Sequence, residues 1–240
     1  MYRILLLFSI ALLGCTSESP FTEKTCNESA GHMVFKPCRE LTYMAKFWDT
    51  ENNLISESRV WIMATGNAWE FSDRQNELLI AYEFDSTDVE RINEYAINKG
   101  LNDRLWQKQE ATGVIENENQ IWMHPFRSNQ YNFTEVAPFP SIRLRIEPGV
   151  QWSSTLSIYD GWGDWANSTL TNNYEIVGYE EIETPFSSLE AWHVDSYTSA
   201  PFGISTHNFW FHHDLGFVKM IIHNYAGQTL QIELIDVKDS

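Results

Sequence analysis

The stretch ISTHNFWFHHDLGFVKMIIHNY, residues 204–225, decides the fold class. Two runs rich in β-branched and aromatic residues flank a short segment, DLG, and this arrangement is typical of a β-hairpin. Side chains alternate between the two faces of a strand, so His212 and His213 point to opposite sides. His207 and His213 share a face, but at about 3.3 Å per residue they lie roughly 20 Å apart. Because a zinc ion holds its nitrogens at about 2.1 Å, we predict a strand here and no metal site.

One register of this hairpin would bring two histidines together. A three-residue loop, 214–216, closed by a left-handed Gly216 would set His207 opposite His223. A four-residue loop would place His223 against Asn208 instead. The favourable register supplies two imidazoles and no third ligand, so we predict no metal and no other cofactor. His207 and His223 are kept as part of a candidate polar site.

The same alternation with a period of two runs through most of the chain from about Met33 onward, and turn residues recur between the runs. Such strands have one face on a core and one in water. The predicted inward-facing sets are Leu41, Tyr43, Ala45 and Phe47; Leu78, Ile80, Tyr82 and Phe84; Ile142, Leu144 and Ile146; Trp152, Leu156 and Ile158; and Leu230, Ile232 and Leu234.

One segment, TDVERINEYAINKG at 87–100, has helical spacing instead. Thr87 and Glu90 suit a capping box, and Gly100 suits a helix end, which predicts one helix of about three turns.

We therefore predict a mainly β fold, a curved antiparallel sheet or an incomplete barrel or sandwich with one short helix. A single domain over residues 33–240 is expected, because no internal linker is polar enough to separate domains. A two-lobed sheet divided near Pro138–Pro140 is the alternative. The 10 Trp, 10 Tyr and 14 Phe residues are ample to fill one core.

The chain begins MYRILLLFSIALLGC, with a positive Arg3 ahead of an apolar run of about ten residues. This run is too short to span a bilayer, which needs roughly 20 residues, and it predicts a signal peptide at 1–14. The sequence LLGC resembles the lipobox of bacterial lipoproteins, and the resemblance implies cleavage before Cys15 and acylation of that cysteine, for example with palmitate. An ordinary secretory signal is the alternative. Residues 15–32 are polar and are expected to form a flexible tether.

If Cys15 carries lipid, Cys26 and Cys38 remain as an even pair in a compartment where disulfides persist. We predict that they are bonded, which would stabilise the fold by at most about 3 kcal/mol. The alternative is two free, buried thiols.

The charge of the chain excludes one class of partner. The full sequence has 16 Lys and Arg against 33 Asp and Glu, a net charge of −17. Removing 1–14 takes one Arg and no acid, so 15 minus 33 leaves −18. Such a protein repels phosphate backbones and anionic headgroups, so nucleic acid is not an expected partner. Membrane attachment has to come from the lipid.

The loop YDGWGDW contains three aromatic and two acidic residues around two glycines. Tyr159, Trp162 and Trp165 beside Asp160 and Asp164 suit a ligand site for sugars, with rings stacking on C–H faces and oxygens accepting hydroxyl protons. The alternative is a loop whose tryptophans fold back onto the core. The two aspartates could also be an acid and base pair of a glycosidase, but their spacing in one loop sets no distance.

In the segment IWMHPFR, His124 and Arg127 could meet an anionic group, and a bonded, structural imidazole is the alternative. This segment resembles, together with VAPFPSIRL, EPGVQW, YEIVGYEEIETPFSSLEAWHV and FWFHHDLGFVKM, a group of lipoproteins of Bacteroidota-type bacteria. The likeness covers Ile121 to Met220. The C-terminal half of these lipoproteins in turn resembles a wider family of periplasmic β-rich proteins of unknown function. It implies an envelope protein with a curved antiparallel sheet, and it carries no catalytic residue to transfer.

Three hypotheses on function follow. The first is a non-enzymatic, lipid-anchored envelope protein that binds an apolar or amphipathic ligand, or an envelope partner, through an aromatic concave face; a small glycan is a second candidate ligand, suggested by the loop 159–165. The second is an envelope hydrolase of glycans or esters, with Asp160, Asp164, His207 and His223 converging on one cleft. The third is a structural or assembly lipoprotein. The sequence has no G-x-S-x-G, H-E-x-x-H or C-x-x-C motif, so an enzyme has no positive support and the catalytic residues are unknown. Thr16 follows Cys15 where inner-membrane lipoproteins carry aspartate, and this resemblance implies the outer membrane.

Overall fold

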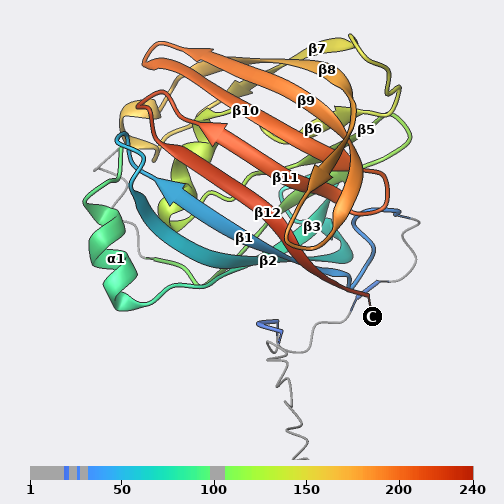
Figure 1. Ribbon diagram of the computed structural model, residues 1–240, viewed down its shortest axis with the longest axis horizontal. Helices are drawn as coiled ribbons and strands as arrows, with labels where there is room; N and C mark the ends of the chain where they lie inside the picture. Colours follow the sequence, from blue (N-terminus) through green and yellow to red (C-terminus); the bar gives the residue numbers. More distant parts are fainter. Residues whose placement is uncertain (1–18, 22–25, 28–31, 98–105, 240) are drawn as a thin grey trace, which may run out of the picture.

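The computed structural model describes residues 19–21, 26–27, 32–97 and 106–239. Its twelve strands form one sheet in the order β6-β5-β4-β3-β2-β1-β12-β11-β10-β9-β8-β7 (Figure 1). Every neighbouring pair is antiparallel. The predicted mainly β fold with a curved antiparallel sheet is confirmed.

The strands are β1 (Glu40–Trp48), β2 (Leu54–Trp69), β3 (Ser72–Tyr82), β4 (Gln109–Glu116), β5 (Gln120–Met123), β6 (Ser141–Arg143), β7 (Gln151–Ser157), β8 (Thr169–Glu183), β9 (Ser188–Ala200), β10 (Gly203–His212), β11 (Gly216–His223) and β12 (Thr229–Lys238). The helical elements are α1 (Ser86–Asn93) and the 3-10 helices η2 (Asn129–Val136) and η3 (Gly163–Trp165).

The topology explains why the sheet curls. The first half of the chain winds outward from β1 to the edge strand β6, and the second half winds inward from the other edge, β7, to β12, which pairs with β1. A flat sheet of this size would hold its edges about 50 Å apart. The connection 144–150 between the edges spans at most about 28 Å. The sheet must therefore bend into the open half-barrel of Figure 1.

Both halves belong to one continuous sheet, so the alternative of two lobes divided near Pro138–Pro140 does not describe this structure. The assignment of 33–240 to a single domain stays a prediction.

The concave face of the sheet is packed by the chain's own side chains. The inward residues of β1, β3 and β12 are buried as the alternation predicts. The segment 124–139, which contains η2, packs its aromatic rings against them. The ring pairs are Tyr43–Phe126 at 6.4 Å, Phe47–Phe133 at 5.8 Å and Tyr82–Tyr131 at 5.3 Å between centroids. The interior of the half-barrel is thus a core.

Two predicted strands are less regular than expected. β6 has only three residues, so Leu144 and Ile146 lie beyond it and are partly buried. In β7, Trp152 and Leu156 are also only partly buried, because this strand is a sheet edge with one neighbour.

The predicted helix is present, but its cap differs. Asp85 is the N-cap, and its side chain accepts hydrogen bonds from the backbone amides of Thr87 and Asp88. The side chain of Asp88 accepts from the Asp85 amide in return. The predicted Thr87–Glu90 capping box was wrong because an aspartate two positions earlier satisfies the free amides of the first turn. The helix ends at Asn93, short of three turns, and Gly100 lies outside the described residues.

Residues 32–39, here called the N-terminal strap, tie the two halves of the sheet together. The Glu116 carboxylate in β4 accepts hydrogen bonds from three consecutive strap amides, those of residues 33–35, at 2.6–3.0 Å. Arg39 donates to the backbone carbonyl of Asp214 in the β10–β11 turn at 2.5 Å. Gly216 follows that turn, and a side chain there would collide with Val34.

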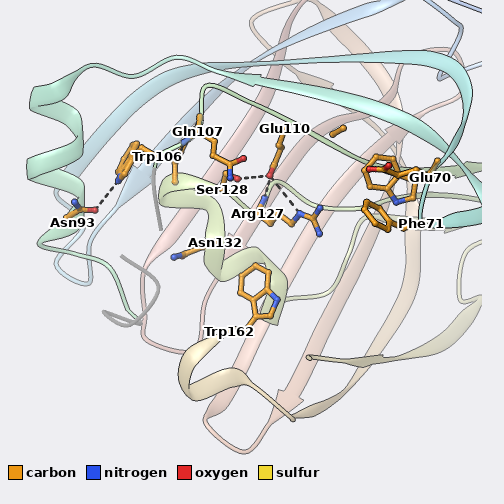
Figure 2. Close-up of a pocket in the computed structure, with 13 residues that line it drawn as sticks. Glu70, Phe71, Asn93, Trp106, Gln107, Glu110, Arg127, Ser128, Asn132 and Trp162 are labelled. Carbon is orange, nitrogen blue, oxygen red and sulfur yellow. Dashed lines mark hydrogen bonds and ion pairs between the residues drawn. The ribbon is translucent and has the colours of Figure 1, made fainter. Parts of the chain in front are cut away.

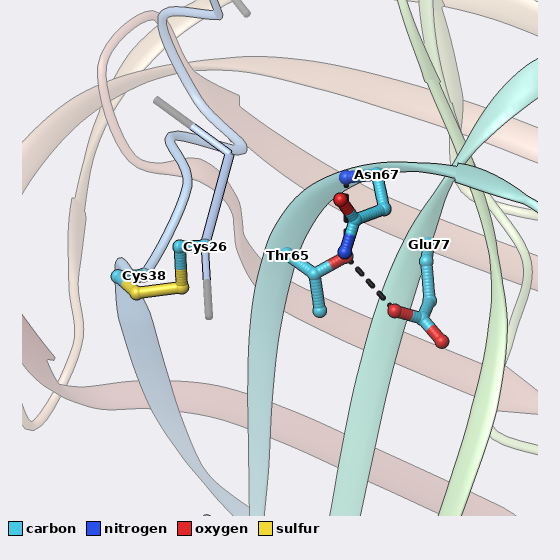
Figure 3. Close-up of a disulfide and its surroundings, with 5 residues drawn as sticks. All are labelled: Cys26, Cys38, Thr65, Asn67 and Glu77. Carbon is cyan, nitrogen blue, oxygen red and sulfur yellow. Dashed lines mark hydrogen bonds between the residues drawn. A yellow bond between two sulfur atoms is a disulfide. The ribbon is translucent and has the colours of Figure 1, made fainter. Parts of the chain in front are cut away.

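The predicted disulfide is present in the structure. Cys26 and Cys38 are bonded, with their Cα atoms 5.7 Å apart, beside Thr65 of β2 (Figure 3). The amide of Asn27 donates to the Thr65 carbonyl at 2.8 Å. The disulfide therefore joins residue 26 to the strap, and the Asn27 hydrogen bond joins the same short segment to β2.

The predicted signal peptide at 1–14 and the lipidation site Cys15 lie outside the described residues. Within the described part of the chain, no helix has the length and apolar character needed to cross a membrane.

Candidate aromatic cleft

An open cavity of about 480 Å³ lies where α1, β4, η2 and the β2–β3 turn come together (Figure 2). We call it the aromatic cleft. It is lined by Trp69, Glu70, Phe71, Asn93, Trp106, Gln107, Glu110, Ala111, Arg127, Ser128, Asn129, Asn132 and Trp162.

A carboxylate and a guanidinium occupy the middle of the cleft. Glu110 pairs with the buried Ile80 of β3, and directly paired residues share a face, so the Glu110 side chain lies on the inner side of the sheet. This side chain is 8% exposed. Its oxygens accept hydrogen bonds from the hydroxyls of Tyr82 and, at 2.6 Å, of Ser128. Arg127 Nε lies 3.8 Å from the same carboxylate.

The hydroxyl of Tyr82 is fixed as a hydrogen-bond donor. Burial, followed by the charge of Glu110, raises the pKa of Tyr82 well above its ordinary value. Its ring also stacks on Tyr131 of the packed segment. The Glu110 carboxylate is therefore held in place from the core side, and its charge is partly balanced by Arg127, whose side chain is 34% exposed.

Aromatic rings from three separate elements surround this pair. Figure 2 shows Trp106, Trp162 and Phe71 on three sides of Glu110 and Arg127. Trp106 donates from Nε1 to Asn93 at 3.3 Å. Phe71, in the β2–β3 turn, is 77% exposed and packs edge-on against Trp69. The cleft therefore presents ring faces to solvent.

Amide side chains complete the lining. Asn129 exchanges two hydrogen bonds with the backbone of Gln107, both at 2.9 Å. These bonds tie the start of η2 to the segment before β4. Asn93 and Asn132 add further amide groups at the rim. Ring faces next to amides, a carboxylate and a guanidinium can bind a ligand that has both apolar C–H faces and hydroxyl groups.

The residues of the predicted loop site at 159–165 do not line one common cavity. Trp165 is buried and donates to the Tyr225 hydroxyl at 2.8 Å, as expected if the loop folds back onto the core. Tyr159 is 78% exposed, and Asp160 accepts a hydrogen bond from Asn167. Trp162 stacks on Trp165 and reaches the aromatic cleft. Of the five loop residues predicted as a ligand site, Asp164 among them, one therefore lines this cavity.

Of the predicted pair His124 and Arg127, only Arg127 lines the cleft. His124 is partly buried and donates from Nδ1 to the carbonyl of Pro125 at 3.0 Å. Burial lowers the pKa of His124 from 6.5 to about 4. Its geometry is that of a bonded, structural imidazole.

Neither predicted hairpin register occurs. Gly216 is left-handed, with φ of 76°, but the turn spans 213–215, and a β-bulge follows it. Val218 is the extra residue, since the partners on either side are Phe211 with Phe217 and Trp210 with Lys219. Bulges of this kind depend on packing and shift the register by one residue.

As a result, the two histidines of the predicted polar site face apart. His223 pairs with Thr206, is exposed and contacts the Thr229 hydroxyl at 2.9 Å. His207 is buried and donates from Nδ1 to the carbonyl of Pro138 at 2.7 Å. Burial lowers the pKa of His207 from 6.5 to about 4.

The groups predicted for a hydrolase do not converge. Asp160, Asp164, His207 and His223 do not line the aromatic cleft, and His207 is buried whereas His223 is exposed. Within residues 19–21, 26–27, 32–97 and 106–239, no group of three or more His, Cys, Asp or Glu side chains could hold a metal ion.

Most residues of the cleft could not be predicted from the sequence. Trp69 and Phe71 come from one segment and Trp106 and Glu110 from another, and no short motif contains both segments. The aromatic residues of the cleft do not stand out in the sequence, because many more aromatic residues are buried in the core.

The fold matches several solved structures. No family model matches the sequence, and no curated protein matches it. A "putative exported protein with YmcC-like fold" from Bacteroides fragilis aligns over 86% of this chain and 98% of its own, with 11% identity and a TM-score of 0.48. A "putative lipoprotein" from Parabacteroides distasonis aligns over 90% and 100%, with 12% identity and a TM-score of 0.44.

The "hypothetical lipoprotein YmcC" from Escherichia coli aligns over 83% of this chain and 85% of its own, with 12% identity and a TM-score of 0.35. Two of these three structures are described as lipoproteins, the class that the sequence resembles. At such identities and TM-scores they carry no information on activity or ligand.

Proposed function

We propose that this protein is a non-enzymatic, lipid-anchored protein of the cell envelope that binds a glycan in the aromatic cleft. The observation that carries the proposal is the Glu110–Arg127 pair, set among exposed ring faces. Sugars have C–H faces that stack on aromatic rings, and hydroxyl groups that donate to carboxylates and accept from guanidinium and amide groups. An amphipathic ligand of this kind fits the mixed lining better than an apolar one.

The packed interior argues against binding of an apolar ligand on the concave face of the sheet. The concave face that would hold such a ligand is filled by rings of the segment 124–139. An apolar molecule would have to displace this core, at a cost that no surface contact offsets. The cleft at its margin is therefore the better candidate for binding.

The proposal also includes the organisation of the chain. Residues 1–14 act as the signal peptide, Cys15 carries the lipid, 15–32 form the tether, and 33–240 form one β-rich domain. The outer membrane is the proposed location. The disulfide and the N-terminal strap support a lipid anchor ahead of the fold. The disulfide holds Cys26, inside the proposed tether, to Cys38, and the strap amides bind Glu116, so both would resist pulling on the tether.

The test uses two aromatic residues of one loop. Trp162 lines the cleft, whereas Tyr159 is 78% exposed and lies outside it. Titrating the full chain with oligosaccharides of N-acetylhexosamines and of hexoses, followed by tryptophan fluorescence and calorimetry, should show saturable binding. Trp162→Ala should weaken it about tenfold, which corresponds to about 1.4 kcal/mol. Tyr159→Ala should leave the affinity unchanged.

Two results would contradict the proposal. One is the absence of binding to any of these glycans at millimolar concentration. The other is an equal effect of Trp162→Ala and Tyr159→Ala, which would point to a general loss of loop order. Binding of decanoate in place of sugars would favour the apolar-ligand hypothesis.

A further inference from the structure

The edge strand β7 leaves one row of backbone groups unpaired. It pairs with β8 on one side and is the last strand of the sheet. Backbone bonds of Val150 with Ile176 and of Ile158 with Ser168 flank the strand on the β8 side. Successive residues of an antiparallel strand direct their N–H and C=O groups to opposite sides. The odd-numbered residues 151–157 therefore turn these groups away from β8, and no bond to them is found in the described part of the chain.

This edge lacks the features that usually prevent strand pairing. The strand reads QWSSTLS, without a charged residue or a proline, and its register with β8 has no bulge. Protected edges carry charges, prolines or bulges, or are very short. The opposite edge, β6, has only three residues and contains Arg143. In β7, by contrast, the side chains of Ser153, Ser154 and Thr155 are exposed.

The strand is also complementary to itself. We propose that a second copy of this chain pairs antiparallel with β7, with the twofold axis at Ser154. Trp152 then lies opposite the partner's Leu156, and Ser153 lies opposite the partner's Thr155. The odd-numbered residues face one another as hydrogen-bonded pairs, which is the side on which their backbone groups are free. Aromatic–aliphatic and hydroxyl pairs of this kind favour strand pairing.

The charge of the protein favours this edge over other surfaces for self-association. Two copies of a chain with a net charge of −17 repel each other where acidic residues meet. β7 brings no carboxylate to the contact. The nearest acid on the neighbouring strand is Glu175, which accepts a hydrogen bond from Gln151 at 3.0 Å and lies one strand further from the partner. The proposal does not depend on what the aromatic cleft binds.

Cysteine cross-linking tests the register directly. In the proposed dimer the two Ser154 Cα atoms form a non-hydrogen-bonded pair about 4.5 Å apart, within reach of a disulfide. The two Thr155 Cα atoms lie about 7–8 Å apart, beyond ready reach. Full chain carrying Ser154→Cys, purified in detergent and mildly oxidised, should give about tenfold more covalent dimer than Thr155→Cys. The parent chain, with its own cysteines, gives the background.

A second measurement avoids added thiols. Thr155→Pro removes an N–H that points away from β8, so the fold should persist while pairing is blocked. Sedimentation of the parent chain should show a dimer that dissociates on dilution, and Thr155→Pro should shift it to monomer. Thr155→Val, which keeps the N–H, should remain dimeric.

Three outcomes would overturn the proposal. The first is a parent chain that stays monomeric at all concentrations tested. The second is equal cross-linking of Ser154→Cys and Thr155→Cys. The third is cross-linking of Ser154→Cys in the native envelope to a different protein and not to itself, which would assign the edge to a strand of another partner.

Discussion

The packed segment 124–139 and the aromatic cleft use the same residue types for opposite purposes. Phe133 in the segment is 2% exposed and stacks on Phe47. Phe71 at the cleft is 77% exposed and touches Trp69 by its edge. Both are phenylalanines beside another aromatic ring, so composition cannot separate them. What separates them is whether the sheet curls over the residue, and this depends on how distant strands pair.

Truncating a side chain of the packed segment should lower the free energy of unfolding more than any other substitution proposed here. Phe133→Ala removes a fully buried ring and leaves a cavity that the surrounding rings cannot refill. We expect the free energy of unfolding to fall by about 4 kcal/mol. Urea denaturation followed by circular dichroism measures this. A loss below about 1 kcal/mol would mean that the segment packs loosely and that the concave face could admit a ligand.

Lowering the pH should also reduce the free energy of unfolding. The folded pKa values of His207 and His124 lie near 4, below the ordinary 6.5, so the neutral forms are the stabilising ones. Their contribution is complete above about pH 6.5 and is lost as the pH falls toward 4. The loss should approach about 3 kcal/mol for each histidine. Unfolding curves recorded between pH 7 and pH 4.5 give this slope.

Two variants assign the acid effect to a residue. His207→Gln keeps a donor for the Pro138 carbonyl but does not titrate, so the slope should become shallower. His223→Gln, at an exposed position, should keep the parent slope. An unchanged slope in His207→Gln would show that this imidazole is not the group responsible.

The interior was also the part that the sequence predicted best. Leu230, Ile232 and Leu234 alternate with polar residues, and burying one face of a strand requires that pattern. The disulfide was predictable because only Cys26 and Cys38 remain once Cys15 is given to the lipid. The register of the β10–β11 hairpin was not predictable, since the bulge at Val218 is set by packing on both faces of the sheet.

The cleft could not be predicted from the sequence for a related reason. Trp106 precedes β4, Glu110 is the second residue of β4, Trp69 ends β2, and Trp162 lies in a loop of the other half of the chain. Their proximity results from the curl of the sheet, and the curl results from a short connection between its edges. The spacing of residues within one segment contains no information on how the sheet curls. Only Arg127 and Trp162 were expected to take part in a site.

The smallest expected effect on stability gives the most direct comparison of the two regions. Phe71→Ala is the same substitution as Phe133→Ala, made at a ring that solvent already surrounds. Its effect on the free energy of unfolding should stay within about 0.5 kcal/mol, because little apolar surface is buried there. If glycan binds in the aromatic cleft, the same variant should weaken binding about fivefold, since an exposed ring gains its burial only from the ligand. Denaturation and titration of one preparation measure both quantities. A large loss of stability with unchanged affinity would reverse the assignment, making the ring part of the core and the cleft a gap between packed elements.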